Sequence, residues 1–324
     1  MHQALELYGL KGPKAEFIRH NENITYKIID IDKKYVLRIH KPCDGFSLGI
    51  FNINDERIKL IQSELEIILA LKNGTDLPMQ MPIYGINGKL VQIISDNTPV
   101  ILLEWVEGQK LEDANITPEI LKNIGKLIAT MHEFFIQNAE KYKGCFRYNY
   151  DQTIIDSIQE NIKKASKIGT ITQIQAQDIL SALEEMHHRF DELDSIEEKC
   201  IVHSDLSMSN LILNDDGRIT PIDFSLCGYS HFYMDIGSIF GHITDDESRG
   251  YILKGYRSIR DCEIESYYIE PYFALQVILF IACQYERAKD WDWFSEVLEK
   301  WCNEIFKPLA NKTGFLRKGD AYEL

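Results

Sequence analysis

The chain has 324 residues, of which 45% are hydrophobic and 26% charged, so it has the composition of a globular enzyme and enough length for two lobes with separate cores. No stretch approaches the roughly 18 consecutive apolar residues of a membrane-spanning helix, and we expect no membrane partner. The formal net charge of −15 argues against nucleic acid as a partner, because nucleic-acid-binding surfaces need an excess of Lys and Arg.

The first hundred residues mainly predict strands. Residues 24–31 and 34–40 are rich in apolar and β-branched side chains, and the short polar connection between them indicates a hairpin. The segment 41–59, rich in Gly, Asn and Asp, predicts a loop, and the apolar spacing within 61–72 predicts an amphipathic helix. Three further strands are expected at 81–84, 90–95 and 99–104.

After Gly108 the pattern changes to long helices. The segment Thr117-Pro118-Glu119 is a typical helix start, with a cap residue, a proline and an acidic side chain, and this helix should reach about residue 136. Further helices are expected at 151–166, 173–195, 264–287 and 291–305.

This change of pattern predicts an α+β fold with two lobes. We expect a β-rich N-terminal lobe over 1–104, a helical C-terminal lobe over 105–324 and a hinge near 104–108. The first lobe holds 12 basic and 13 acidic side chains and the second holds 23 and 37, so nearly all of the negative charge lies in the second. An acidic lobe favours a cationic substrate, although surface charge that serves solubility accounts for the same excess.

Two motifs in the second lobe carry the candidate chemistry. The first reads H-S-D-L-S-M-S-N over 203–210, and the second, I-D-F-S, places Asp223 at the end of a short strand. Asp205 can accept the proton of an attacking hydroxyl, and Asn210 and Asp223 offer oxygen ligands of the kind that Mg²⁺ prefers. Each residue alone would equally suit a helix cap or a turn. Together they have the spacing of phosphoryl transfer from a nucleotide, which predicts ATP and Mg²⁺ as cofactors.

A kinase also needs a cation for the nucleotide phosphates and an acid that holds this cation. Arg38 lies in the middle of an apolar strand, on the face opposite Leu37 and Ile39, and a buried arginine must be paired. Glu64, on the helix that follows, is the expected partner. A surface ion pair or a solvated strand face is the alternative, and either would contribute little.

Two other segments would contact the nucleotide. The connection 20–26 lies where a glycine-rich flap would cover the phosphates, but it contains no glycine, so side chains such as Asn23 and Thr25 would have to help. A plain polar hairpin turn is the alternative. Backbone groups of Glu104 and Val106, at the end of an apolar strand, would meet the edge of adenine or guanine, so the sequence does not distinguish ATP from GTP.

Over residues 15–290 the chain resembles the aminoglycoside phosphotransferase and choline kinase-like family, whose fold is similar to that of protein kinases. The most specific part is the pair of motifs above together with L-C-G-Y-S-H-F-Y-M-D-I-G over 226–237. The segment Y-V-L-R-I-H-K-P over 35–42 is similar to the branch of the family that includes type II homoserine kinase. That branch tolerates an arginine in place of the usual lysine and a flap without the glycine pattern.

The resemblance implies a role for each candidate residue. Asp205 would be the catalytic base, Asn210 and Asp223 the Mg²⁺ ligands, and Arg38 the phosphate contact held by Glu64. The resemblance also implies that Asp235 braces the catalytic loop from a following helix and that His203 orients it. Ser204 stands where the family commonly has glycine.

The sequence therefore predicts an enzyme that moves the γ-phosphate of a nucleotide to a hydroxyl of a small molecule. Acidic and aromatic side chains are mixed in 263–273 and 291–293, which suits an amine-bearing acceptor such as an aminoglycoside, an amino sugar, an amino alcohol or a homoserine-like compound. One alternative is a Ser/Thr protein kinase, although the chain lacks a glycine-rich flap and an A-P-E-like segment. The other is a non-catalytic nucleotide-binding relative, against which the intact motifs argue.

The cysteines and the first residues bear on the cellular compartment. The seven cysteines are scattered, odd in number and without a C-x-x-C pair, which argues against a disulfide framework or a zinc site. The first residues, M-H-Q-A-L-E-L-Y-G-L-K, lack the basic region and apolar core of a signal peptide. We therefore expect a cytoplasmic enzyme.

Overall fold

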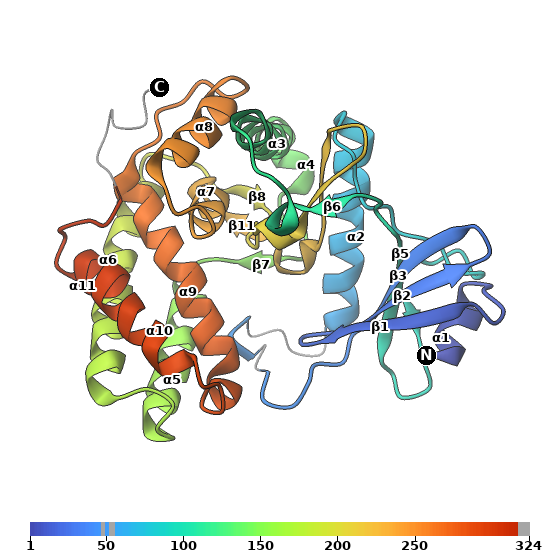
Figure 1. The fold of residues 1–324 in the computed structure, drawn as a ribbon, viewed down its shortest axis with the longest axis horizontal. Helices are drawn as coiled ribbons and strands as arrows, with labels where there is room; N and C mark the ends of the chain where they lie inside the picture. Colours follow the sequence, from blue (N-terminus) through green and yellow to red (C-terminus); the bar gives the residue numbers. More distant parts are fainter. Residues whose placement is uncertain (47–48, 52–55, 317–324) are drawn as a thin grey trace.

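The computed structural model describes residues 1–46, 49–51 and 56–316 and places a β-rich part beside a larger helical part (Figure 1). The β-rich part is an antiparallel five-stranded sheet with the strand order β1-β2-β3-β5-β4. Its strands are β1 Lys14–His20, β2 Ile24–Asp30, β3 Lys33–Ile39, β4 Gln92–Ile93 and β5 Pro99–Glu104. The predicted α+β class is confirmed, whereas part of the loop predicted at 41–59 lies outside the described residues.

Two predicted strands were wrong in extent. Residues 81–84, all of them described, form only an isolated bridge between Pro82 and Leu103, because proline has no N–H with which to continue a ladder. Of the segment 90–95, only the two residues of β4 pair with β5.

A short helix that the sequence analysis did not predict, α1 (His2–Leu7), precedes the sheet. Tyr8 follows it, and its hydroxyl lies 2.7 Å from the carbonyl oxygen of Leu90 and 3.0 Å from that of Val100. This contact fastens α1 to the sheet. Strand β4 is short because the carbonyl of Leu102, further along β5, accepts a hydrogen bond from the N–H of Ile83.

Helix α2 (Arg57–Gly74) lies between the sheet and the helical part (Figure 1). It contains the helix predicted at 61–72 and ends at Gly74, where α2 comes close to the next long helix. A Cβ at Gly74 would lie 2.1 Å from the ring of Phe134, so a larger residue there would require this ring to move.

The helical part contains the predicted long helices and others. The predicted ones are α3 Pro118–Gln137, α5 Gln152–Lys167, α6 Gln173–Asp194 and α9 Ser266–Ala288. Periodicity predicted neither α7 (Tyr233–Phe240), a helix that the family resemblance does imply, nor α8 (Asp246–Arg257). The helix predicted at 291–305 is divided into α10 Phe294–Trp301, a π-helical turn Cys302–Phe306 and α11 Lys307–Ala310. A one-turn helix, α4 (Ala139–Tyr142), follows α3.

Helices α3 and α8 cross at two glycines. A Cβ at Gly125 on α3 would lie 1.9 Å from the carbonyl oxygen of Ile252, and a Cβ at Gly255 on α8 would lie 2.0 Å from that of Lys122. The two backbones are therefore in direct contact. Helix α3 begins as predicted, since the Thr117 hydroxyl accepts a hydrogen bond from a main-chain N–H of the first turn.

Two small sheets frame the loops that carry the motifs. One has the order β10-β9-β6 and the other β7-β11-β8. Their strands are β6 Gln109–Lys110, β7 Tyr148–Asn149, β8 Cys200–Val202, β9 Leu211–Leu213, β10 Ile219–Pro221 and β11 Gly228–Ser230. Single 3₁₀ turns occur at Gly49–Phe51, Leu111–Asp113, Met208–Asn210 and Phe224–Leu226. The loop 203–210 thus runs from one small sheet to the other.

Among the described residues, α9 is the one helix that is long and apolar enough to cross a membrane by length and composition. In this fold, 61% of its most apolar window is buried, and it packs against α5, α6 and α7. A helix that is apolar on most sides and covered by neighbours is the central helix of a globular core.

Candidate active site

The catalytic loop holds two predicted residues in direct contact. The side-chain amide of Asn210 donates hydrogen bonds to the main-chain oxygen and to Oδ2 of Asp205, each at 2.9 Å. These bonds fix the orientation of the Asp205 carboxyl group. They use the amide nitrogen of Asn210 and leave its amide oxygen as the atom suited to a metal.

Asp235, in the first turn of α7, braces this loop as the family resemblance implies. Its carboxylate accepts hydrogen bonds from the main-chain N–H groups of His203 (2.9 Å) and Ser204 (2.7 Å). The buried His132 side chain lies 2.9 Å from the same carboxylate. Nε2 of His203 lies 3.0 Å from the carbonyl oxygen of Ile222, which joins the first motif to the second.

The backbone of Ser204 adopts the left-handed conformation, with φ of +67°. Any residue other than glycine pays about 1–2 kcal/mol for this conformation, since its Cβ approaches a carbonyl oxygen. The hydrogen bonds that this part of the loop donates to the carboxylate of Asp235 hold the strained backbone in place.

Asp223, just after β10, binds two arginines. Nη2 of Arg38 lies 3.1 Å from Oδ1, and Nη2 of Arg19 lies 2.6 Å from Oδ2. Burial alone would raise the pKa of Asp223, but the two guanidinium groups outweigh burial and hold this pKa below its ordinary value. Asp223 is therefore a charged carboxylate.

Arg38 and Glu64 form the contact that strand alternation predicts. Nη1 of Arg38 donates to Oε1 of Glu64 at 3.0 Å, and both side chains are buried. Burial would lower the pKa of Arg38, but Asp223 and Glu64 outweigh it and raise this pKa, so the guanidinium stays charged. Arg38 thus joins β3, α2 and the segment after β10.

In the flap, Asn23 and Thr25, which we expected to contact the phosphates, do not line the pocket. Asn23 and Thr25 are buried, and the amide of Asn23 donates to Oε1 of Glu22 at 2.8 Å. Glu22, together with Asn21, lines the pocket instead. Asn23 therefore orients Glu22, and its contact with phosphate stays a prediction, as does that of Thr25.

The segment after β5 keeps part of its backbone free for a purine. The N–H of Glu104 donates to the carbonyl oxygen of Met81 at 2.8 Å, so it is already used. The carbonyl oxygen of Glu104 accepts from the side chain of Gln80 at 2.9 Å and has a second lone pair for another donor. Val106 lies two residues further along, and its contact with a purine stays a prediction.

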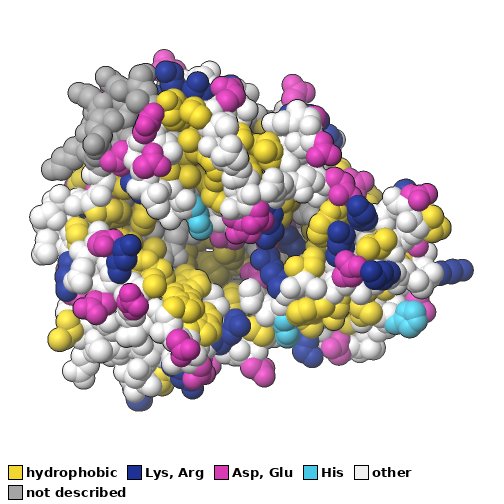
Figure 2. Space-filling view, viewed as in Figure 1, with side chains coloured by type: hydrophobic (Ala, Val, Ile, Leu, Met, Phe, Trp, Pro, Cys, Tyr) yellow, Lys and Arg dark blue, Asp and Glu magenta, His cyan; other side chains and the backbone are white. Residues whose placement is uncertain are grey.

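A pocket of about 210 Å³ brings these segments together. Its lining includes Asp205 and Asp223 from the two motifs, Glu22 from the flap, and Gln276 and Phe280 from α9. Figure 2 shows the surface hollowed between the β-rich and the helical part, with Lys and Arg side chains beside the hollow on the side of the sheet.

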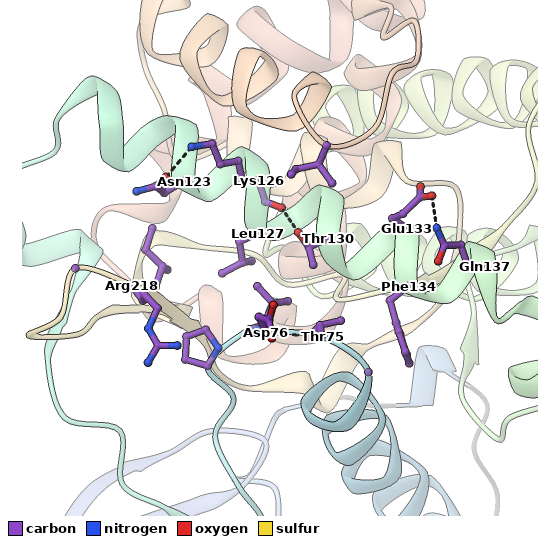
Figure 3. A pocket seen from close by; sticks show the side chains of 16 residues that line it. Thr75, Asp76, Asn123, Lys126, Leu127, Thr130, Glu133, Phe134, Gln137 and Arg218 are labelled. Atoms are coloured by element: carbon purple, nitrogen blue, oxygen red, sulfur yellow. Dashed lines mark hydrogen bonds between the residues drawn. The ribbon is translucent and has the colours of Figure 1, made fainter.

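A second cavity, of about 540 Å³, lies between the end of α2, α3 and the β9–β10 turn (Figure 3). No residue of the two motifs lines it. Its polar side chains bond along α3 instead of converging: Lys126 contacts Asn123, and Gln137 contacts Glu133 (Figure 3). We assign no catalytic role to this cavity.

The donor set around Asp223 fits Mg²⁺. Oδ1 of Asp223 is buried and, although Nη2 of Arg38 lies 3.1 Å away, it accepts no hydrogen bond from the described residues. The amide oxygen of Asn210 is a second hard ligand. In the described part of the chain, no group of three or more His, Cys, Asp or Glu side chains could hold a metal alone. The remaining ligands would be water and phosphate oxygens, as is usual for Mg²⁺ in kinases.

Three carboxyl groups crowd the pocket and change one another's ionisation. Burial, followed by the charges of Asp223 and Glu22, raises the pKa of Asp205 to about 8. Burial and Asp223 likewise raise the pKa of Glu22 to about 7. A carboxyl group whose pKa lies near neutrality is well matched to proton transfer at physiological pH.

The sequence does not predict several residues that lie at this site. Arg147 donates to the carbonyl oxygens of Leu60 (2.8 Å), Ser225 (2.6 Å) and Cys227 (2.7 Å), and Gln276 donates to that of Ser204 (2.9 Å). Arg147, Gln276 and His132 carry no local signal, because their partners are distant in sequence. Arg19 and Glu22 did have a signal, since they are charged residues near the end of β1 and within the flap turn.

Known proteins resemble this chain in sequence and in fold. Hydroxylysine kinase from Xenopus laevis is 25% identical over 247 residues, which are 67% of this chain and 64% of that protein. The Protein LicA homolog from Metamycoplasma hominis is 27% identical over 142 residues, or 44% of this chain and 50% of that protein. The chain thus matches less than two thirds of the length of either relative.

Two solved structures share the fold over nearly their whole length. A microcompartment-associated aminopropanol kinase superposes with a TM-score of 0.73 at 20% identity and covers 98% of both chains. Amicoumacin kinase in complex with AMP-PNP, Ca²⁺ and Ami superposes with a TM-score of 0.72 at 20% identity and covers 98% of this chain and 94% of the other. The fold is therefore that of small-molecule kinases.

A family model extends over most of the chain. The model of the phosphotransferase enzyme family (APH) matches residues 14–263, a range that includes the flap, Arg38, the catalytic loop and Asp223. This match agrees with the resemblance that the motifs carry. The chain belongs to the phosphotransferase enzyme family.

Proposed function

We propose that this chain transfers the γ-phosphate of a nucleotide to a hydroxyl group of a small molecule. The observation that carries the proposal is one pocket lined by Asp205 and Asp223, with Arg38 held beside Asp223 by Glu64. Membership of a phosphotransferase family supports it, as do relatives that are named kinases of small molecules.

Each residue has a definite task in this proposal. Asp205, oriented by Asn210, takes the proton of the acceptor hydroxyl as the oxygen attacks phosphorus. Arg38, held by Glu64, binds the phosphates of the nucleotide. Mg²⁺ would be held by Asn210 and Asp223, and when bound it would neutralise part of the negative charge on the nucleotide phosphates.

The nucleotide is proposed to be ATP, with GTP as the alternative. The free lone pair of the Glu104 carbonyl suits a purine amino group, and the backbone of Val106 would provide a second contact. We further propose that the chain divides into lobes at 1–104 and 105–324, with the hinge at 104–108. The seven free cysteines support the proposed cytoplasmic location, because thiols persist in a reducing compartment.

The acceptor is proposed to carry an amine. Glu22 and the ring of Phe280 line the pocket with Asp205, and an ammonium group is attracted by both a carboxylate and an aromatic face. The names of relatives fit this chemistry, since aminopropanol and hydroxylysine each hold an amine and a hydroxyl.

The first experiment measures thermal unfolding with Mg²⁺ and ATP or GTP, followed by release of ADP or GDP in the presence of amino alcohols, hydroxyl-bearing amino acids, amino sugars and aminoglycosides. A higher melting temperature with nucleotide and release with one acceptor class would support the kinase and identify its substrate. A shift without release for any acceptor would favour a non-catalytic nucleotide-binding relative. No shift with either nucleotide would contradict the proposal.

A further inference from the structure

We propose that Arg19, on β1 just before the flap, is a phosphate-binding residue. It pairs with Asp223 in the free protein, and its side chain moves to the nucleotide phosphates on binding. This inference rests on the proposed function and adds to it a side chain that would bind phosphate in place of the main-chain N–H groups of a glycine-rich flap. Its starting point is the contact of 2.6 Å between Nη2 of Arg19 and Oδ2 of Asp223.

The register of the sheet explains how Arg19 reaches this position. An irregularity in β1 between Phe17 and Arg19 shifts the pairing by one residue, so Arg19 lies opposite Thr25 on β2. Thr25 in turn lies opposite Arg38 on β3. Residues opposite one another in neighbouring strands share a face of the sheet, so both arginines face Asp223. Without the extra residue, Ile18 would occupy the place of Arg19.

The charges around Asp223 show that Arg19 is the exchangeable partner. Arg38 has a second acid, Glu64, and both of these side chains are buried. Arg19 is 49% exposed, and among the described residues Asp223 is the one acid with which it forms an ion pair. A metal ion that takes the carboxylate of Asp223 would therefore leave Arg38 paired and Arg19 without a partner.

The flap needs such a cation, because its backbone cannot enclose phosphates as a glycine-rich flap does. The segment between β1 and β2 has no glycine, and the N–H of Asn21 already donates to the carbonyl oxygen of Asn23 at 3.2 Å. A guanidinium group presents several donors in one plane and keeps its charge, which matches phosphate oxygens. Arg19 lines the same pocket as Asp205 and Asp223, so it needs only a side-chain rotation to leave the carboxylate for a phosphate.

The test compares ligand binding in the wild type, in Arg19→Gln and in the control Lys14→Gln by isothermal titration calorimetry. Lys14 lies on the same strand and carries the same charge, but it is exposed and pairs with Glu16. In Arg19→Gln we expect Mg·ATP to bind about 10- to 100-fold more weakly, as the loss of a charge-assisted hydrogen bond implies. Adenosine should bind within about twofold of the wild type, because it has no phosphate.

A second readout uses Mg²⁺ alone. Because Arg19 competes with the metal for Asp223, Arg19→Gln should bind Mg²⁺ more tightly than the wild type when no nucleotide is present. Arg19→Lys, which keeps the charge without the planar fork, should bind Mg·ATP with an affinity between those of the wild type and Arg19→Gln. Thermal unfolding of each variant checks that it is folded.

Four outcomes would overturn the inference. Wild-type affinity of Arg19→Gln for Mg·ATP would refute the phosphate contact, and an equal loss for adenosine would indicate only a structural role. An equal loss in Lys14→Gln would indicate a general effect of charge. If the wild type itself binds neither Mg·ATP nor Mg·GTP, the proposed function fails and the inference fails with it, whereas the first three outcomes leave the proposed function intact.

Discussion

At the scale of single residues, the position of Asp205 is fixed from two sides. Asn210 holds its carboxyl group, and Asp235 holds the main chain of the two residues before it. A carboxylate held in this way can act as a base without first being ordered, which lowers the entropy lost in reaching the transition state.

The base assignment predicts the effect of Asp205→Asn. The substitution keeps the size of the side chain but removes the proton acceptor, so turnover should fall by about 10²–10⁴-fold. Nucleotide affinity should stay within about threefold of the wild type, because no nucleotide contact is lost. Steady-state release of ADP and calorimetric titration with Mg·ATP measure the two effects. Near-normal turnover would show that another group takes the proton.

The strained backbone of Ser204 leads to a prediction on stability. Ser204→Gly should raise the free energy of unfolding by about 1 kcal/mol, because glycine adopts a φ of +67° without strain. Ser207 lies in the same loop with an ordinary φ of −121°, so Ser207→Gly should lower that free energy instead. Urea unfolding of both variants provides the comparison, and a lower stability of Ser204→Gly would refute strain at this position.

Motif spacing pointed to the candidate site residues that lie within one short segment, and strand alternation pointed to the pair of Arg38 and Glu64. Asp205, Asn210 and Asp223 belong to a loop and the hairpin after it, so their meeting is decided locally. Arg147 and Gln276 could not be predicted, because they reach the site only after helices far along the chain have packed. Arg19 depends on a register shift in β1 that no sequence pattern shows.

At the scale of secondary-structure elements, Arg147 joins α2 to the segment after Asp223. Its guanidinium group donates to the carbonyl oxygens of Leu60, Ser225 and Cys227. The helix that carries Glu64 and the segment that carries Asp223 are thereby held together by main-chain contacts.

Arg147→Lys should therefore destabilise the protein although the charge is kept. An ammonium group cannot reach three carbonyl groups in the fixed geometry of a guanidinium, and the carbonyls left without donors would cost about 1–3 kcal/mol. Arg218→Lys is the matched control, because Arg218 is 61% exposed and, of the residues that the structure describes, Asp216 is the one acid with which it pairs. Urea unfolding measures both, and equal stability of the two variants would contradict this role of Arg147.

Elements were predicted well where one face of a long helix is apolar and a cap marks its start. Helix α6 is an example, with Thr172 and Gln175 forming a capping box. Helix α7 could not be predicted from periodicity, because all of its eight residues are buried and it has no polar face. Strand β4 was predicted too long, since alternation does not reveal that the carbonyl of Leu102 on β5 accepts a hydrogen bond from the N–H of Ile83 instead.

At the scale of the whole molecule, buried histidines make stability depend on pH. His231 is fully buried, and Nδ1 lies 2.7 Å from the hydroxyl of Tyr272. Burial lowers the pKa of His231 to about 4, and the positive charge of Lys199 contributes to this shift. Asp194, which lies 3.0 Å from Nε2, acts to raise the pKa but is outweighed. The unfolded chain, with an ordinary histidine pKa of about 6.5, therefore binds a proton first as the pH falls.

This difference predicts that the free energy of unfolding falls as the pH is lowered from about 6.5 to about 4, by at most about 1.4 kcal/mol per pH unit from this residue. His40, whose pKa burial also lowers, adds to the same trend. Urea unfolding between pH 4.5 and 7.5 should give a shallower slope for His231→Gln than for the wild type. An identical slope would show that His231 does not contribute.

The two-part architecture was predictable because the pattern of the sequence changes after Gly108. The period of apolar residues passes there from that of strands to that of helices, and the family match agrees with the fold that this change indicates. The boundary at 104 stays a prediction, since α2 belongs by sequence to the first part and contacts α3 of the second.

The apolar character of α9 bears on the order in which the protein is made. Three of the helices that pack against it, α5, α6 and α7, precede it in the chain and therefore leave the ribosome before it, whereas α10, whose Trp301 contacts Phe280, follows it. This long apolar helix thus emerges when three of the helices that shield it have already been made. If these helices followed α9 in the chain, α9 would be exposed to solvent during synthesis. It could then aggregate or be bound by the machinery that inserts proteins into membranes.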